Sequence, residues 1–112
     1  MLSIRNNQIT LTRGDTARID LAISKDGSAY DFSADTVIFT VKESVYASDY
    51  LIQKTVTDGV IYIAPADTES LAYGTYVYDV QDTTANGDIC TVIPPTKFIV
   101  APEVTWTAAT AS

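Results

Sequence analysis

Apolar and polar side chains alternate most regularly between residues 75 and 81. Tyr76, Tyr78 and Val80 fall on one face of an extended chain, and the residues between them fall on the other. A period of two with aromatic and β-branched residues predicts a strand with one buried face. We expect this face to be the centre of the core, with a tyrosine hydroxyl bonded to a backbone group as in a tyrosine corner. Its expected neighbours are Leu21, Phe39 and Phe98.

Shorter segments on both sides repeat the alternation. The predicted strands cover residues 8–12, 16–24, 36–42, 51–57, 60–64 and 97–101, after a lead-in segment that contains Ile4. Residues 44–50 break the pattern and are expected to form an exposed excursion between strands. Turn signals recur about every 8 to 12 residues, the spacing of all-β domains. The pattern therefore predicts an all-β fold, an immunoglobulin-like antiparallel β-sandwich of seven to nine strands.

The strongest hairpin signal is Asn86-Gly87, because both residue types tolerate the positive φ of a two-residue turn. The pairs that such a turn predicts are Val80 with Ile93 and Thr84 with Ile89, all on the tyrosine side. A register slip of one residue would turn the isoleucines outward. The hydrophobic pattern and the turn therefore predict the same register.

Two other reversals are predicted by local sequence. An Asp-Gly pair at 58–59 predicts a tight turn that joins 51–57 and 60–64 as a hairpin. Residues 67–71 are too short for a stable helix and predict a single helical turn, with Leu71 closing the end of a sheet.

Composition indicates one globular domain. The chain has 112 residues, of which 46% are hydrophobic and 19% charged, and we place the domain at 1–105 and a loosely ordered tail at 106–112. The net charge of −7 and the scattered positions of the basic residues argue against nucleic acid as a partner. The N-terminus has no apolar signal-peptide core and no run reaches transmembrane length, so we expect no membrane partner and folding in a cytoplasm.

The residue types that most enzyme chemistry needs are missing or wrongly spaced. The chain has no histidine, which excludes Ser-His-Asp and Cys-His nucleophile pairs and most catalytic zinc sites. No segment has the closely spaced oxygen ligands of a calcium loop. Cys90, the single cysteine, is expected to be an inert, partly buried thiol. We expect no enzymatic activity: no catalytic residues, no cofactor and no metal site.

The carboxylates are expected in solvated loops and caps. Asp58, Asp82 and Asp88 are placed at turns, with Asp79 on the opposite strand face from Asp82. A hydrolase that uses two carboxylates remains an open alternative, because a sequence does not give the distance between two acids. The Arg-Gly-Asp tripeptide at 13–15 matches an integrin-binding sequence, but it lies where two strands need a kink and is expected to be structural.

Three groups of residues follow one another in a recognisable order. The first is the segment 9–16, ITLTRGDT. The second comprises Asp67, Thr68, Leu71, Gly74, Tyr76, Tyr78, Asp79 and Val80, and the third comprises Gly87, Thr91, Ile93, Pro94, Phe98, Val100, Val104 and Thr105. Together they resemble a family of small immunoglobulin-like proteins of tailed bacteriophages and prophages, in particular the N-terminal domain of phage baseplate upper proteins. The resemblance covers residues 8–105.

This resemblance implies a non-enzymatic virion structural protein, a tail, baseplate or decoration component with other virion proteins as partners. Such a protein would be assembled in the bacterial host cytoplasm. In the baseplate proteins this domain docks the chain to the particle, and a later part reaches the receptor-binding protein. The chain ends at Ser112 without that part, so an accessory or decoration protein is an equally open expectation.

The main alternative is an adhesion or carbohydrate-binding β-sandwich module. It would need a row of exposed aromatic side chains on a groove or sheet. The candidates are Tyr30, Tyr46, Tyr50, Tyr62 and Trp106.

Assembly contacts are expected at strand edges, which expose unpaired N–H and C=O groups. By their place in the chain, 8–12 and 97–101 are predicted to be edge or near-edge strands. We therefore expect a homo-oligomer or a partner contact through the two termini, rather than through the hairpin tip at 86–87.

Overall fold

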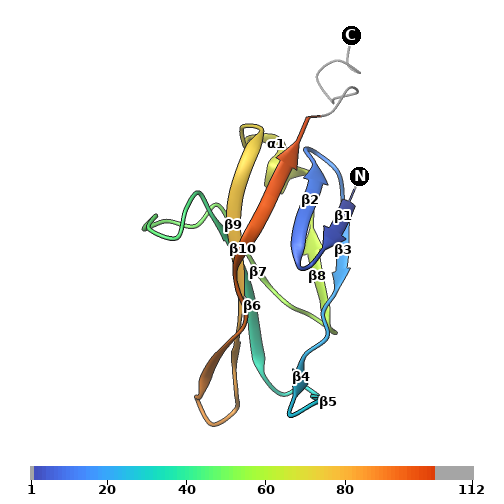
Figure 1. Cartoon of the computed structure of the whole chain (residues 1–112), viewed down its shortest axis with the longest axis vertical. Coiled ribbons are helices and arrows are strands. Elements are labelled where there is room, and N and C mark those ends of the chain that lie inside the picture. The colour runs from blue at the N-terminus through green and yellow to red at the C-terminus, as the bar shows by residue number, and fades with distance from the viewer. Residues whose placement is uncertain (1, 103–112) are drawn as a thin grey trace.

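The computed structural model describes residues 2–102, so the tail expected at 106–112, with Trp106, lies outside the described residues. The described chain forms ten strands and one short helix (Figure 1). They are β1 Leu2–Arg5, β2 Gln8–Thr12, β3 Ala17–Asp20, β4 Ser24–Lys25, β5 Ser28–Ala29, β6 Thr36–Lys42, β7 Ile52–Thr55, β8 Val60–Ile63, α1 Pro65–Glu69, β9 Gly74–Thr83 and β10 Ile89–Ala101. The all-β prediction is confirmed. The strand count exceeds seven to nine because segment 16–24 splits into β3 and β4 and β5 is added, while the predicted strand 97–101 and the strand after the Asn-Gly turn are one continuous strand, β10.

Six strands form one large sheet in the order β1-β2-β10-β9-β6-β7. β3 and β8 form a two-stranded sheet, and β4 and β5 form a separate small hairpin (Figure 1). β2 and β10 run parallel to each other, so the expectation of a purely antiparallel arrangement is wrong for this pair. A parallel pair needs a long connection, and here nearly the whole chain lies between the two strands.

Buried side chains from both main sheets meet in one core, which gives the chain a sandwich-like, two-layer structure. The core includes Ile9 and Leu11 of β2, Ala17 and Ile19 of β3, Val37, Phe39 and Val41 of β6, Ile61 and Ile63 of β8, Tyr78 and Val80 of β9, and Phe98 and Val100 of β10. Each strand contributes alternate residues, as the period-2 pattern predicted. Leu71, just after α1, is partly buried and packs against this core.

Three aromatic rings occupy the centre of the core. The ring centroid of Phe39 lies 5.3 Å from that of Tyr78 and 6.2 Å from that of Phe98. Tyr78 is 3% exposed, whereas Tyr76 is only partly buried and packs against the edge of the cluster. The strand face was therefore assigned correctly, and Tyr78 rather than Tyr76 is its most buried tyrosine.

Both tyrosine hydroxyls reach backbone carbonyls, which confirms the expected hydrogen bond. Tyr76 Oη donates to the carbonyl oxygen of Ala72 at 2.6 Å, four residues upstream. Tyr78 Oη donates to the carbonyl oxygen of Asn7, in the turn between β1 and β2. The second bond therefore attaches the N-terminal hairpin to the middle of the large sheet.

We expect Tyr78→Phe to lower the free energy of unfolding by about 1 kcal/mol, the usual net value of one hydrogen bond. The ring packing stays intact, and the exposed carbonyl of Asn7 can turn to water. Urea unfolding followed by fluorescence measures the change. Tyr46→Phe, at a site 94% exposed, serves as the control and should change the free energy by less than about 0.5 kcal/mol. Equal effects of the two changes would contradict the assigned role of the Tyr78 hydroxyl.

The turn at 58–59 forms as predicted, but the hairpin does not. Asp58 and Gly59 take φ values of 53° and 75°, and Thr57 and Val60 exchange backbone hydrogen bonds across the turn. β7 then pairs with β6 and β8 pairs with β3, so the two segments belong to different sheets. The turn carries the chain from one layer to the other.

The β9–β10 hairpin closes with a three-residue loop instead of the expected two-residue turn. Gly87 N–H donates to Thr84 O at 2.9 Å, Thr84 N–H donates to Asp88 O at 2.8 Å, and Gly87 takes a φ of 90°. A three-residue loop with glycine at the positive-φ position is the second common way to close a hairpin. The Asn-Gly pair therefore located the turn correctly but not its length.

The register differs from the predicted one near the turn, and it shifts again between Ile93 and Thr96. Val80 lies opposite Ile93 as predicted, whereas Ile89 lies opposite Thr83 instead of Thr84. The one-residue slip reverses the side-chain direction, so Ile89 points away from the core and is 68% exposed. A register shift between Thr91 and Ile93 returns the side chain of Ile93 to the predicted strand face.

The two strands predicted to be edge or near-edge strands are not edges of the large sheet, although β2 is second from the edge that β1 forms. β2 lies between β1 and β10, and β10 lies between β2 and β9. The edge positions of this sheet belong to β1 and β7. Position along the chain misled the prediction, because β2 and β10 protect each other by pairing in parallel.

Candidate functional site

A loop at residues 43–51, between β6 and β7, projects from the body of the molecule (Figure 1). Four large apolar side chains in it face solvent. Their exposed fractions are 50% for Val45, 94% for Tyr46, 56% for Tyr50 and 42% for Leu51. The exposure of 44–50 agrees with the prediction. Four large apolar side chains are therefore exposed on one short loop.

Hydrogen bonds hold the base and the first turn of this loop. Lys42 Nζ donates to the carbonyl oxygen of Ala47 at 3.1 Å, and Ala47 N–H donates to Ser44 O at 3.1 Å. At the other end Leu51 N–H donates to Val41 O at 2.7 Å. The loop is therefore shaped before any partner binds, which reduces the entropy lost on binding.

The other exposed tyrosines lie on different elements and have a cation above the ring. The guanidinium of Arg18 lies 5.0 Å from the Tyr62 ring centroid on β8. That of Arg13 lies 4.3 Å from the Tyr73 ring centroid, just before β9. Tyr30 is partly buried, and its ring lies 3.8 Å from Lys25 Nζ. The predicted aromatic candidates in the described part of the chain therefore belong to three separate segments and not to one row.

The Arg-Gly-Asp tripeptide is built into the structure. Gly14, with a φ of 83°, donates its N–H to Thr68 Oγ1 at 2.8 Å, and Thr68 is fully buried. Arg13 donates to the hydroxyl of Tyr73 at 3.0 Å and to Leu71 O at 3.4 Å. These contacts attach the β2–β3 turn to α1 and the segment after it. They support the structural interpretation of the tripeptide.

The position of Asp82 differs from the one expected from the sequence. It lies in β9 rather than at a turn, it is 0% exposed, and neither carboxylate oxygen has a hydrogen-bond partner. Its side chain points the same way as those of Tyr78 and Val80. Extending their alternation by one step would have predicted its burial. A buried carboxylate without hydrogen bonds is unusual enough to require an explanation.

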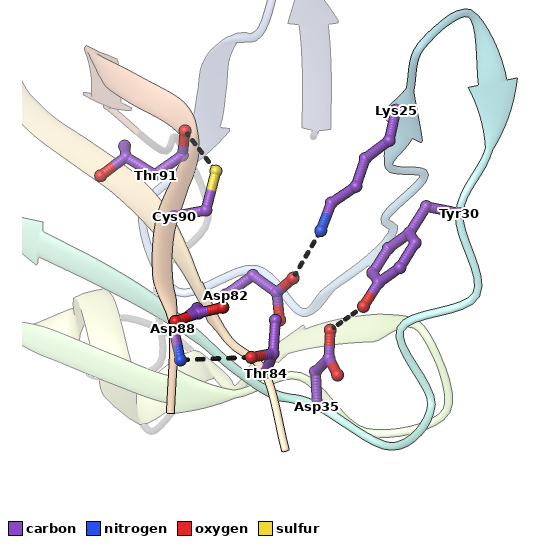
Figure 2. A network of polar contacts seen from close by, with 8 residues as sticks. All are labelled: Lys25, Tyr30, Asp35, Asp82, Thr84, Asp88, Cys90 and Thr91. Atoms are coloured by element: carbon purple, nitrogen blue, oxygen red, sulfur yellow. Dashed lines mark hydrogen bonds and ion pairs between the residues drawn. The ribbon is translucent and has the colours of Figure 1, made fainter. Parts of the chain in front are cut away.

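Three polar residues surround Asp82 (Figure 2). Lys25 of β4 places Nζ 4.0 Å from Asp82 Oδ2, and Lys25 is itself 40% exposed. Asp35 lies beside Asp82 and accepts a hydrogen bond of 2.7 Å from the hydroxyl of Tyr30. We call Lys25, Tyr30, Asp35 and Asp82 the carboxyl cluster. It lies where the β4–β5 hairpin meets the end of the large sheet (Figure 1).

Burial is the main reason why the pKa of Asp82 is raised above its usual value of 3.8. The neighbouring Asp35 raises this pKa further, first by the hydrogen bond that a protonated pair can form and then by its charge, while the Lys25 charge lowers it. The hydrogen bond to Asp35 raises the pKa of the Tyr30 hydroxyl to about 12. Tyr30 therefore stays a hydrogen-bond donor at every pH near neutrality.

The structure also places the single cysteine and the carboxylates that the sequence brought into question. Cys90 is exposed and not partly buried as expected, because the β9–β10 hairpin extends past the end of the β3–β8 sheet (Figure 1). Within residues 2–102, no group of three or more Cys, Asp or Glu side chains could hold a metal ion. Asp35 and Asp82 form a close acid pair, but the full burial of Asp82 keeps it from a substrate.

Comparisons with known proteins do not assign the chain to a family. No protein-family model matches it, and searches of curated proteins and of solved structures return no significant match. None of the helices in the described residues is long and apolar enough to cross a membrane.

Proposed function

We propose that this chain is a non-enzymatic structural protein of a phage or prophage particle, a tail, baseplate or decoration component that acts through protein–protein contacts. The observation that carries the protein–protein contact is the projecting loop 43–51 with its four exposed apolar side chains. Burying such side chains against a partner removes apolar surface from water and favours association.

The chemistry of the loop defines the partner surface. Tyr46 and Tyr50 are residues of the type that dominates binding energy at protein interfaces when they enter a pocket. Glu43 and Asp49 flank them and are exposed. The matching surface is an apolar pocket with a basic rim, on a neighbouring subunit of the particle.

The particle assignment rests on the family resemblance, and the arrangement of strands supports it. Within residues 2–102, most members of the three groups that carry the resemblance fall on β2, β9 and β10, while Asp67 and Thr68 belong to α1. These strands are neighbours in the large sheet, in the order β2-β10-β9. The matching residues therefore make up one continuous piece of the fold rather than three unrelated segments.

Self-association is part of the same proposal, with its site revised. β1 and β7 are the edge strands of the large sheet, and β7 directly follows loop 43–51. Strand addition at β7 would place the loop against the same partner. The contact expected at the termini is retained only for β1, since β2 and β10 have strands on both sides.

Particle incorporation tests the proposal. We expect the wild-type chain to co-sediment with purified particles of its host strain and to appear there by mass spectrometry. The double variant Tyr46→Ala/Tyr50→Ala should lose most of this association, because both aromatic anchors are removed. It should keep the wild-type melting temperature, because neither side chain is part of the core.

Tyr62→Ala, which removes an exposed tyrosine from β8, is the matched control and should leave incorporation unchanged. A chain found only in the soluble lysate would contradict the particle assignment. Retention on immobilised glycans that depends on Tyr46 would instead support the carbohydrate-binding alternative.

A further inference from the structure

The carboxyl cluster joins two parts of the fold that otherwise have little holding them together. Lys25 comes from the two-residue strand β4, whose partner β5 also has two residues. The hairpin pairs only with itself, through Ser24–Ala29 and Lys25–Ser28, and the backbone bond from Tyr30 N–H to Ile23 O at 2.8 Å closes its base. Contacts of the Lys25 side chain therefore help to decide whether the hairpin stays docked.

The protonation state of the cluster determines how many of its polar atoms have a hydrogen-bond or ion-pair partner. With both acids ionised, two carboxylates face one ammonium group, and both Asp82 oxygens lack a hydrogen bond. If Asp82 holds one proton, its hydroxyl can donate to Asp35, which already accepts from Tyr30 at 2.7 Å. Lys25 then balances the single remaining negative charge. In the one-proton state the cluster has no net charge, and both carboxyl groups have hydrogen-bond or ion-pair partners, as buried charged groups require.

Other titratable groups near the cluster do not supply the missing charge. On the segment between β5 and β6, Asp31 is exposed and adds negative charge. On the β9–β10 side, Asp88 and Cys90 are exposed (Figure 2). Of the charged groups that the structure places around Asp82, Lys25 is the cation within 4.0 Å.

We propose that Lys25, Tyr30, Asp35 and Asp82 form a proton-dependent clasp. While the Asp35–Asp82 pair holds one proton, the clasp keeps the β4–β5 hairpin against the end of the sandwich. When that proton is lost to water, the hairpin loosens. Loosening opens the end of the core next to Val37 and Val80. The clasp lies away from loop 43–51 (Figure 1), so it is independent of the proposed particle contact.

The expected pH dependence follows from the direction of the Asp82 shift. Because the pKa of Asp82 is raised on folding, its stabilising effect is fully present below the unfolded value, about 3.9, and is lost as the pH rises through the folded value. Asp31 acts in the opposite sense, because backbone and side-chain hydrogen bonds from Ser33 lower its pKa. Its stabilising effect is lost only as the pH falls below the usual range of an aspartate. Asp82 and Asp31 therefore affect stability in different pH ranges.

Direct titration of the Asp82 side chain by carbon NMR is the first test. We expect its midpoint in the wild type to lie above 3.8, the usual value of an aspartate. Asp35→Asn should lower the Asp82 midpoint, because it removes the second acid, whereas Lys25→Gln should raise it, because it removes the cation. A wild-type midpoint at or below the usual aspartate value, or shifts of the same sign in both variants, would overturn the clasp.

Hydrogen exchange then measures the hairpin itself. In the wild type, the protection of the Tyr30 amide, corrected for its intrinsic rate, should fall as the pH rises from the unfolded value of about 3.9 through the raised folded pKa of Asp82. The fall should be roughly tenfold for each unit by which the folded pKa exceeds the unfolded one. The Arg13 amide, bonded to Ala101 O at 2.9 Å and remote from the β4–β5 hairpin, should keep its protection.

In Asp82→Asn the protection of the Tyr30 amide should no longer depend on pH. Asp49→Asn removes the same charge from an exposed loop and should behave as the wild type does, which controls for the net charge of −7. Equal pH dependence in Asp82→Asn and the wild type would overturn the proposal. If Asp82→Asn does not fold, the carbon NMR titrations of the wild type, Asp35→Asn and Lys25→Gln still test the proposal.

Discussion

Replacing Phe39 by alanine is expected to lower the free energy of unfolding by about 3–5 kcal/mol, the range for deleting a fully buried aromatic ring. Phe39 is 0% exposed and its ring lies against both Tyr78 and Phe98, at centroid distances of 5.3 and 6.2 Å. β6 pairs with β7 and β9, so the backbone around the cavity is held and cannot collapse into it. Urea unfolding followed by circular dichroism measures the loss.

Phe32→Ala is the matched control, because it deletes the same ring from a half-buried position beside the turn at 58–59. We expect a loss well below that of Phe39→Ala. Comparable losses in the two variants would show that the aromatic cluster is not the centre of the core.

Replacing Asp67 by alanine is expected to lower the free energy of unfolding by about 1–2 kcal/mol, the combined effect of a helix-start hydrogen bond and a partly screened ion pair. Asp67 Oδ2 accepts from Ala64 N–H at 2.7 Å, which fixes the chain as it enters α1. The same oxygen lies 2.9 Å from Lys54 Nζ on β7. One carboxylate therefore connects the edge of the large sheet to the segment that follows β8.

A double-mutant cycle separates the two contributions of Asp67. Asp67→Asn keeps an acceptor for Ala64 N–H and removes the charge, so we expect it to lose less than Asp67→Ala. When Lys54→Met is already present, adding Asp67→Asn should cause almost no further loss, because the ion pair is gone. Glu69→Ala, on the same helix but exposed, should change stability by less than about 0.5 kcal/mol. A loss for Glu69→Ala as large as for Asp67→Ala would contradict the assigned contacts.

Strand faces were predictable because side-chain direction alternates along any extended chain, whatever it pairs with. Tyr78, Phe39 and Phe98 are buried where the period-2 pattern placed them. The turn at 58–59 and the helical turn before Leu71 were also predictable, since positive φ and short polar segments are local properties. The exposure of 44–50 followed from the break in that pattern.

The candidate functional features were only partly predictable. The exposed excursion was expected, but the concentration of four apolar side chains on it became clear only from their exposed fractions. Asp82 was assigned to a turn because its sequence neighbours are polar, although it continues the buried face of Tyr78 and Val80. Its partners Lys25 and Asp35 are far from it in the chain, so only the docking of the β4–β5 hairpin brings them together.

The sequence by itself determined most of the inward-facing strand residues, where the chain turns and that the fold is all-β, because these depend on neighbours one to four positions away. The tertiary structure decided which strands pair: β7 and β8 separate across a well-formed turn, and β2 and β10 meet from opposite ends of the described chain. Pairing depends on how two apolar faces can be buried against each other, and that is a property of the whole chain. The packing of distant segments also brought Lys25 beside the buried Asp82, whose protonation state can influence the fold.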